Sequence, residues 1–452
     1  MDFPSDEKKP EDFRHKHVCA YYGRFEELEN KYKVIYPENE NATYSSLLNY
    51  SDDLEKPFQR WYRYKEGFSI DLVKHLIGEY SRHKGGLILD PFAGSGSTLL
   101  AARQAGYRGV GFEVNPFSYF LAKCKLDVYT GETAESFKQQ YERILKSAQK
   151  RPLAYELPKL SISEKVFDKP VEVFYMTLDR LIDSSDIEDE KVRNLLRLGW
   201  LSCLEPVSNY RKAGNGLKRR KYVKPRVVTV EEVSAALLEE YRNIYQDILT
   251  GRDERESVLY RDSCLHMRRY IEGESVTGII YSPPYANCFD YTEIYKLELW
   301  FGKFVSEYSQ LRELRKQSLH SHLNGNLNVE TETKSETLKG LLDELQKREL
   351  WDKKIPKMLA LYYDDMFHVL KESYQVLEEK GFCCIVVGNS AYGGIIFPAD
   401  LILSEYAEKI GYTVDKIEVD RYIITSSQQY EITKEAGKYL RESVVCLVKN
   451  ES

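Results

Sequence analysis

The segment from Ser282 to Tyr285, with the sequence SPPY, follows an apolar run that is typical of a strand. Two consecutive prolines, Pro283 and Pro284, exclude a helix here and favour a rigid, extended turn. Such a turn could activate an aromatic amino group, which is a poor nucleophile because its lone pair is delocalised into the ring. If the Ser282 hydroxyl and the Pro283 carbonyl accept the two N–H bonds, the nitrogen becomes tetrahedral and its lone pair can attack an electrophilic methyl group.

Tyr285 adds a flat aromatic face to this turn. Stacking of a base on such a face is worth roughly 1–3 kcal/mol. That would help to offset the few kcal/mol needed to flip a base out of a duplex. A purely structural Pro-Pro turn would explain the same four residues, so the catalytic interpretation depends on the loop described next.

A second loop, DPFAGSGST from Asp90 to Thr98, lies between a predicted strand and a predicted helix. Its glycines allow a tight turn and a close approach to a ligand, next to the free N–H groups of the helix N-terminus. In a dinucleotide-binding fold this place holds a pyrophosphate, but an acid at Asp90 suits a cationic amino-acid group, such as the α-amino group of S-adenosylmethionine. The residues that we expect to contact this cofactor are Asp90, Pro91, Phe92, Ala93, Gly94, Ser95 and Gly96.

Glu113 lies about twenty residues beyond this loop, at the end of the next predicted strand. A carboxylate at that position can accept both hydroxyl groups of a ribose. A glycine-rich turn in an unrelated α/β enzyme is the alternative, and the spaced acid argues against it.

The elements that must position these loops follow from the apolar pattern. A strand over 87–89, a helix from about residue 97 and a strand over 109–114 predict a β-loop-α-β unit with a right-handed crossover, and therefore a parallel sheet. A strand leads into Ser282, a helix is predicted from about 355 to 377, and a buried strand, a helix and two closing strands follow.

Together the two loops resemble the amino-methyltransferases of DNA, which methylate N4 of cytosine or N6 of adenine. SPPY is similar to the N4-cytosine members, whereas DPPY and NPPY are usual for adenine. The resemblance implies an α/β, Rossmann-like methyltransferase fold with a mostly parallel sheet and a helical insertion. It also implies S-adenosyl-L-methionine as cofactor, double-stranded DNA with a flipped-out base as substrate, and a restriction-modification setting in which a separately encoded restriction endonuclease is a candidate partner.

Other segments fit the same family. The segment from Pro57 to Ser69 looks like the one that packs on the methionine part of the cofactor, which adds Phe68 and Ser69 to the site; a plain aromatic core segment is the alternative. Asp262 and Ser263 look like the motif that meets the adenine amino group, although a surface turn fits as well. Residues 386–390 and 421–430 look like later motifs near the target base.

The order of the motifs departs from many members, in which the catalytic loop precedes the cofactor loop. Here the cofactor loop comes first and a long, mostly helical region separates the two. We expect an N-terminal extension at 1–55, a catalytic domain at 56–128 and 256–452, a mainly helical insertion at 129–255 as a candidate DNA-recognition region, and a polar loop insertion at 303–340.

A basic stretch lies inside the helical region, between Pro206 and Arg226, and contains no acid. Gly214 and Gly216 favour a loop. A solvated charged surface is the usual explanation for such a run, but in a protein that works on DNA it suits phosphate contacts. The candidate DNA-binding residues are Arg211, Lys212, Lys218, Arg219, Arg220 and Lys221.

Composition narrows the classes of protein to which this chain could belong. The net charge of −6 argues mildly against a nucleic-acid binder, and the eight cysteines form no CxxC pair, so we expect no metal site. No signal pattern or membrane-spanning run is present, which predicts a cytoplasmic protein. The lack of a Pro-Cys pair excludes a cytosine-C5 methyltransferase. An RNA methyltransferase and a catalytically inactive DNA-binding module remain as alternatives.

Overall fold

The computed structural model describes residues 22–44, 47, 50–65, 67, 69–184, 186–214, 216–220, 227–250, 256–423 and 434–451. Its centre is an eight-stranded sheet with the order β1-β11-β12-β8-β7-β2-β3-β6. Five neighbouring strands are parallel: β6 (Ser257–Tyr260), β3 (Arg108–Phe112), β2 (Leu87–Asp90), β7 (Val276–Tyr281) and β8 (Leu377–Gly388). Strand β12 (Arg441–Lys449) runs antiparallel between β8 and β11 (Tyr412–Tyr422), and β1 (Val34–Ile35) pairs with β11. The expected Rossmann-like, mostly parallel sheet is therefore present.

The central strands are buried on both sides, which explains their continuous apolar runs. In β8, Phe382, Cys384 and Val386 belong to one hydrophobic core, and the alternating Cys383, Ile385 and Val387 belong to the other. The sheet thus separates two cores, each covered by helices.

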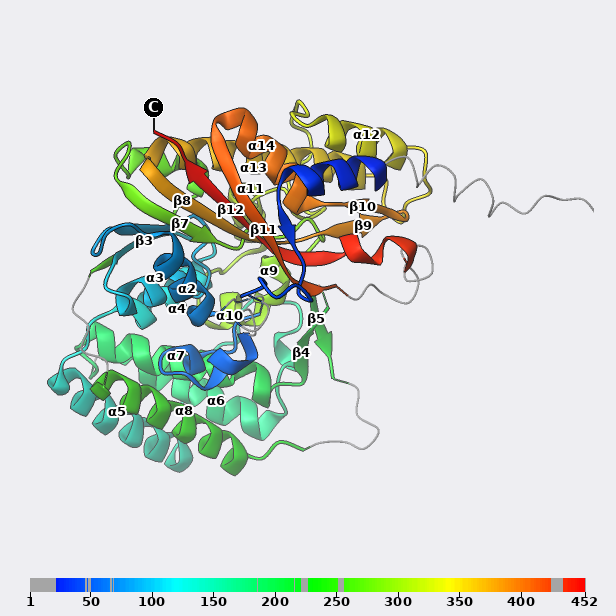
Figure 1. Ribbon diagram of the computed structural model, residues 1–452. Helices are drawn as coiled ribbons and strands as arrows, with labels where there is room; N and C mark the ends of the chain where they lie inside the picture. The colour runs from blue at the N-terminus through cyan, green and yellow to red at the C-terminus, as the bar shows by residue number, and fades with distance from the viewer. Residues whose placement is uncertain are drawn as a thin grey trace, which may run out of the picture.

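One face carries α2 (Ile70–Tyr80), α3 (Ser97–Gln104) and α4 (Pro116–Leu126), and the other carries α13 (Ile355–Val376), α14 (Ala399–Ile410) and α12 (Glu336–Leu345) (Figure 1). Helix α13 begins and ends within a residue or two of its expected bounds. The β2-α3-β3 unit has the predicted parallel connection.

In the described part of the region from 129 to 255, which we expected to be mainly helical, there are four α-helices: α5 (Gly131–Lys150), α6 (Lys169–Ile182), α7 (Glu190–Val207) and α8 (Val230–Thr250). They form a layer beyond α4 and α10 (Lys296–Phe301) (Figure 1). Their apolar side chains, such as Trp200 and Tyr241, belong to the same core as Phe117 of α4 and Trp300 of α10.

Two expectations for loops were wrong. The basic stretch forms a β-hairpin, in which β4 (Tyr210–Ala213) pairs with β5 (Gly216–Arg219), and Gly214 adopts a left-handed φ of +57° in the turn. The polar region from 303 to 340 contains α11 (Tyr308–Gln317), which is hard to see in the sequence because its only buried residues are Leu311 and Leu314.

The remaining described elements are short: η1 (Tyr50–Glu55), η2 (Gln59–Trp61), η3 (Ser163–Lys165), η4 (Cys264–Arg269), α9 (Tyr291–Ile294), β9 (Ser390–Tyr392), β10 (Ile395–Phe397) and η5 (Lys434–Tyr439). In the part of the chain that the structure describes, no helix has the length and apolar character needed to cross a membrane.

Candidate active site

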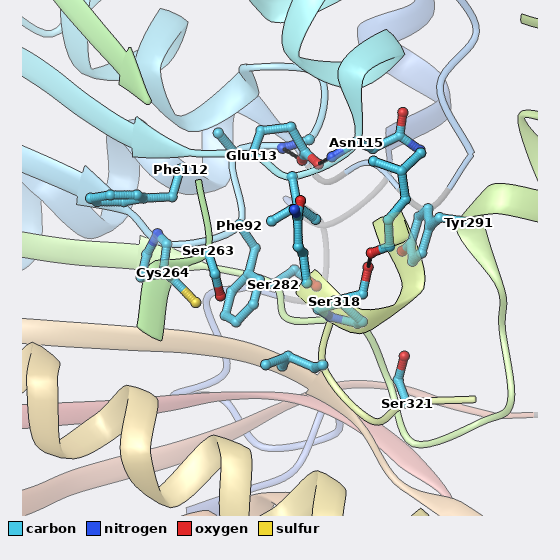
Figure 2. A pocket seen from close by; sticks show the side chains of 18 of the residues that line it. Phe92, Phe112, Glu113, Asn115, Ser263, Cys264, Ser282, Tyr291, Ser318 and Ser321 are labelled. Carbon is cyan, nitrogen blue, oxygen red and sulfur yellow. Dashed lines mark hydrogen bonds between the residues drawn. The ribbon is translucent and has the colours of Figure 1, made fainter. Parts of the chain in front are cut away.

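A cavity opens where the parallel strands β2, β3, β6 and β7 end (Figure 2). The carboxyl ends of parallel strands meet at one edge of a sheet, which is where α/β enzymes bind ligands. The loops that follow these strands, distant in sequence, therefore share one cavity. The expected residues that line it are Pro91, Phe92, Ala93, Gly94, Ser95, Glu113, Asp262, Ser263, Ser282 and Pro284.

Both glycines of the first loop have left-handed backbones, with φ of +49° at Gly94 and +82° at Gly96. Gly94 lies in the cavity wall, where a Cβ would be 3.4 Å from the Tyr64 hydroxyl. Gly96 lies outside the wall and packs on α4, where a Cβ would be 3.1 Å from that of Ala122. Only Gly94 is therefore placed for close contact with a ligand.

Glu113 points into the cavity from the end of β3 (Figure 2). Its carboxylate accepts hydrogen bonds from the backbone N–H of Gly94 at 2.8 Å and of Asn115 at 2.6 Å. Burial raises the pKa of Glu113 to about 7, against the opposing effect of these hydrogen bonds. The carboxylate is thus held rigidly and titrates near neutrality.

Asp90 does not take the expected place beside a ligand. Its side chain is 1% exposed and lies beneath the loop, where it accepts a hydrogen bond from the Phe92 N–H at 2.9 Å. Burial raises its pKa to about 7. Because Asp90 is absent from the cavity wall, we assign it to holding the loop in shape, and not to direct contact with an amino group.

Asp262 and Ser263 enter the cavity after β6. Burial disfavours the charged form of Asp262, but hydrogen bonds from the Tyr270 hydroxyl and His266 outweigh it and hold the pKa of this carboxyl below its ordinary value. Ser263 accepts from the Leu265 N–H as the N-cap of η4. Ser69 similarly caps α2 and does not line the cavity, while Phe68 lies outside the described residues.

The SPPY loop, Ser282 to Tyr285, lies between two hollows. Ser282 and Pro284 line the cavity, and Pro283 is buried behind them. Tyr285 instead faces a neighbouring hollow, together with Asn389, Arg421 and Glu442. The Ser282 hydroxyl donates to the Tyr285 hydroxyl at 3.3 Å, so the two hollows are linked through the loop.

Comparison with known proteins gives this arrangement its context. A family model for DNA methylases matches residues 5–123. The type II methyltransferase M.AvaI of Nostoc sp. is 30% identical over 403 residues, which cover 82% of each chain. The chain belongs to the DNA amino-methyltransferases of the restriction-modification type. M.BsoBI of Geobacillus stearothermophilus is 28% identical over 486 residues, covering 96% of this chain and 93% of that one. M.MvaI of Kocuria varians is 21% identical over 395 residues.

As a member of this family the methyltransferase uses S-adenosyl-L-methionine, and the cavity suits that molecule. Glu113 offers a carboxylate for ribose hydroxyls. Asn115 offers a donor: it is 7% exposed, lies in the cavity wall, and its Nδ2 has no hydrogen-bond partner among the described residues. A buried donor without a partner is costly, and a polar ligand group would satisfy it.

Sequence reasoning missed several residues in the wall of the methyltransferase's cavity. Asn115 could have been found, because it precedes Pro116 at the start of α4 and its side chain caps that helix. Tyr64 belongs to the segment from Pro57 to Ser69, which the sequence linked to the cofactor without naming this residue. Other residues come from segments without a motif: Tyr291, Gln317, Ser318, Ser321 and His322. Tyr291 and Ser318 lie across the cavity from the sheet-edge loops (Figure 2).

A buried chain of hydrogen bonds reaches the cavity from behind. The Lys125 ammonium donates to the Gln59 side-chain oxygen at 2.8 Å, and the Gln59 amide nitrogen donates to the Ser97 hydroxyl at 2.8 Å. Lys125 and Gln59 are fully buried, and burial lowers the pKa of Lys125 to about 7. The charged lysine ammonium can only donate, so in that state the direction of each bond is set and the Ser97 proton is left for Ser95 or a ligand.

The basic hairpin exposes only some of the candidate DNA-binding residues. Arg211, Lys218 and Arg219 are exposed on β4 and β5. Lys212 is withdrawn from the DNA-binding set, because its side chain is 6% exposed and its Nζ lies 2.6 Å from Glu298 and 3.1 Å from Glu205. Arg220 is also withdrawn, since its guanidinium donates to the carbonyls of Ser208, Tyr210 and Glu205. Lys221 lies outside the described residues.

Proposed function

We propose that this methyltransferase transfers a methyl group to N4 of a cytosine that is flipped out of double-stranded DNA. The observation that supports the proposal is the position of Ser282. It lines the cofactor cavity, and its hydroxyl proton is directed to Tyr285, away from the cavity. A hydroxyl oxygen in that state can accept a hydrogen bond from an exocyclic amino group.

The chain's own residues would then act by positioning. Ser282 Oγ and the Pro283 carbonyl each accept one N–H of the amino group, which localises the nitrogen lone pair toward the cavity. The bound cofactor supplies an electrophilic methyl group. The amino nitrogen would form an N–C bond in place of the cofactor's S–C bond, the cofactor would leave as a neutral thioether, and the nitrogen would release one proton to water.

The hollow beside Tyr285 is our candidate for the place of the target base. Its wall combines the aromatic ring of Tyr285 with polar groups of Asn389, Arg421 and Glu442. Trp351, with 69% of its surface exposed, lies in the same wall and could stack on a base or on its neighbour. N6 of adenine is the second candidate target, because the same two acceptors would serve either amino group.

The test is methyl transfer from labelled S-adenosylmethionine to unmethylated DNA, followed by mass spectrometry of the nucleosides. N4-methylcytosine is the expected product. N6-methyladenine would overturn the choice of base and keep the mechanism, whereas methylated RNA with unmodified DNA would overturn the choice of substrate. A partner endonuclease, as part of the same proposal, would cut DNA before but not after this methylation.

A further inference from the structure

Three neighbouring strands place Gly388, Glu442 and Arg421 in one row at the edge of the sheet. Glu442 of β12 is the register partner of Gly388 on β8 and of Arg421 on β11. Because Gly388 has no side chain, the Tyr285 ring can lie directly on this row. A Cβ at Gly388 would be 2.8 Å from Cε2 of Tyr285, closer than van der Waals contact allows.

This packing brings the Tyr285 hydroxyl to Glu442. The hydroxyl donates to Oε1 of Glu442 at 2.6 Å, and Arg421 Nε donates to Oε2 of the same carboxylate at 2.6 Å. Glu442 is only 8% exposed, so the short bond to Tyr285 is sheltered from water. Hydrogen bonds to a carboxylate are shorter and roughly twice as strong as those between neutral groups.

The direction of the hydrogen bonds that link Ser282, Tyr285 and Glu442 follows from the carboxylate at the end of this relay. A carboxylate can only accept, so the one proton of the Tyr285 hydroxyl goes to Glu442. The Tyr285 oxygen accepts from Ser282, at 3.3 Å. With its proton so engaged, Ser282 turns its lone pairs toward the cavity, as acceptance of an amino N–H requires.

We infer that Glu442 is a positioning residue for methyl transfer: through the Tyr285 hydroxyl, it holds Ser282 Oγ in the state that accepts a hydrogen bond from the target amino group. This inference rests on the proposed function of Ser282. Tyr285 would then act through its hydroxyl as well as through its aromatic face. Strand β12 would contribute to the site through Glu442.

A double-mutant cycle in the full-length enzyme tests the relay. The variants are Tyr285→Phe, which keeps the ring, Glu442→Ala, Ser282→Ala, and each of the first two combined with Ser282→Ala. We expect Tyr285→Phe and Glu442→Ala each to lower the single-turnover rate of methyl transfer about tenfold. Affinities for DNA and for S-adenosylhomocysteine should stay within about twofold. In the Ser282→Ala background, neither change should slow the reaction further, because residues that act through one group are not additive.

Tyr107→Phe is the matched control, since the Tyr107 hydroxyl donates to Ser81 and to the His83 carbonyl and this residue lines neither the cavity nor the hollow beside Tyr285. Multiplicative losses in the double variants would overturn the relay, as would wild-type rates in Tyr285→Phe. Tyr285→Phe decides the question even if Glu442→Ala fails to fold. A failure of the proposed function of Ser282 could be told apart from a failure of the relay, because Ser282→Ala would then methylate DNA as fast as the wild type.

Discussion

Glu113 combines a fixed geometry with a pKa near neutrality. Within the described part of the chain, its two oxygens accept hydrogen bonds from backbone N–H groups, and burial raises its pKa to about 7. The ionised form can accept hydroxyl protons of a ribose on both oxygens, whereas the protonated form loses one acceptor. Cofactor affinity should therefore be full above pH 7 and should fall as the pH drops through 7.

Glu113→Gln should remove this pH dependence. We expect the variant to bind S-adenosylhomocysteine about tenfold more weakly at pH 8, roughly the worth of one hydrogen bond to a charged group. Its affinity should no longer fall as the pH drops from 8.5 to 6. Calorimetric titration of both proteins across this range is the measurement, and a parallel pH profile in the two would remove Glu113 from the ribose site.

At the scale of residues, the sequence is enough to predict those side chains whose chemical type the proposed reaction and its cofactor require. Gly94, Glu113 and Ser282 meet in one cavity because each follows a parallel strand. Asp90 shows what the residue type alone does not determine. An acid beside a glycine-rich loop can contact a ligand or stabilise the loop, and the folded structure is needed to distinguish these two roles. Glu442 was beyond prediction, since its link to Tyr285 spans 157 positions and depends on the register of β12.

At the scale of elements, the β4–β5 hairpin is the clearest candidate for contact with DNA phosphates. Arg211, Lys218 and Arg219 are exposed on it. Replacing all three by Ala should weaken DNA binding at every sequence and lower the slope of log affinity against log salt by about 2 to 3, because each phosphate contact contributes about 0.9. Binding of S-adenosylhomocysteine should not change.

Lys212 offers a contrasting variant on the same hairpin. Its ammonium is paired with the buried Glu298, so Lys212→Met should leave that carboxylate without its partner and lower the free energy of unfolding by roughly 3 kcal/mol. The salt slope of DNA binding should stay at the wild-type value. Salt titrations of fluorescently labelled DNA and chemical denaturation separate the two effects. A reduced slope in Lys212→Met would return this residue to the DNA-contacting set.

Elements were predictable where the apolar pattern is strong. The buried strands β2, β7 and β8 and the long helix α13 match their expected positions. The hairpin and α11 were missed for a common reason: few side chains of either element are buried, so neither the two-residue nor the 3.6-residue period is visible.

At the scale of the whole molecule, the helical layer and the sheet share a hydrophobic core, and a buried aspartate links the helical layer to the segment before the cofactor loop. Asp247 of α8 is 2% exposed and accepts from the Phe58 N–H, from Arg60 and from the Trp61 indole. These partners belong to the segment that precedes the cofactor loop. The region from 129 to 255 is thus inserted in the sequence but continuous with the sheet in packing.

Asp247→Ala should therefore destabilise the entire protein. Removing one partner of a buried, hydrogen-bonded charge typically costs about 3–5 kcal/mol. Unfolding in denaturant should remain a single transition with a lower midpoint, and Asp247→Asn should lose less because its amide still accepts one bond. Two separate transitions, one for the helices and one for the sheet, would contradict a shared core.

The lysine buried behind the cofactor loop has a consequence for proton balance. With its pKa lowered to about 7, Lys125 is near half-charged at neutral pH in the free enzyme. A ligand carboxylate accepting from Ser97 would favour the charged form, so binding should draw a proton from the buffer. Titrations of S-adenosylhomocysteine in buffers of different ionisation heat measure the net exchange of protons, which should shift toward release in Lys125→Met because this variant loses the uptake. A thioether nucleoside that lacks the amino-acid group should bind without this proton uptake. Binding of the amino-acid end of the cofactor would then be detectable as a change in the protonation of the enzyme.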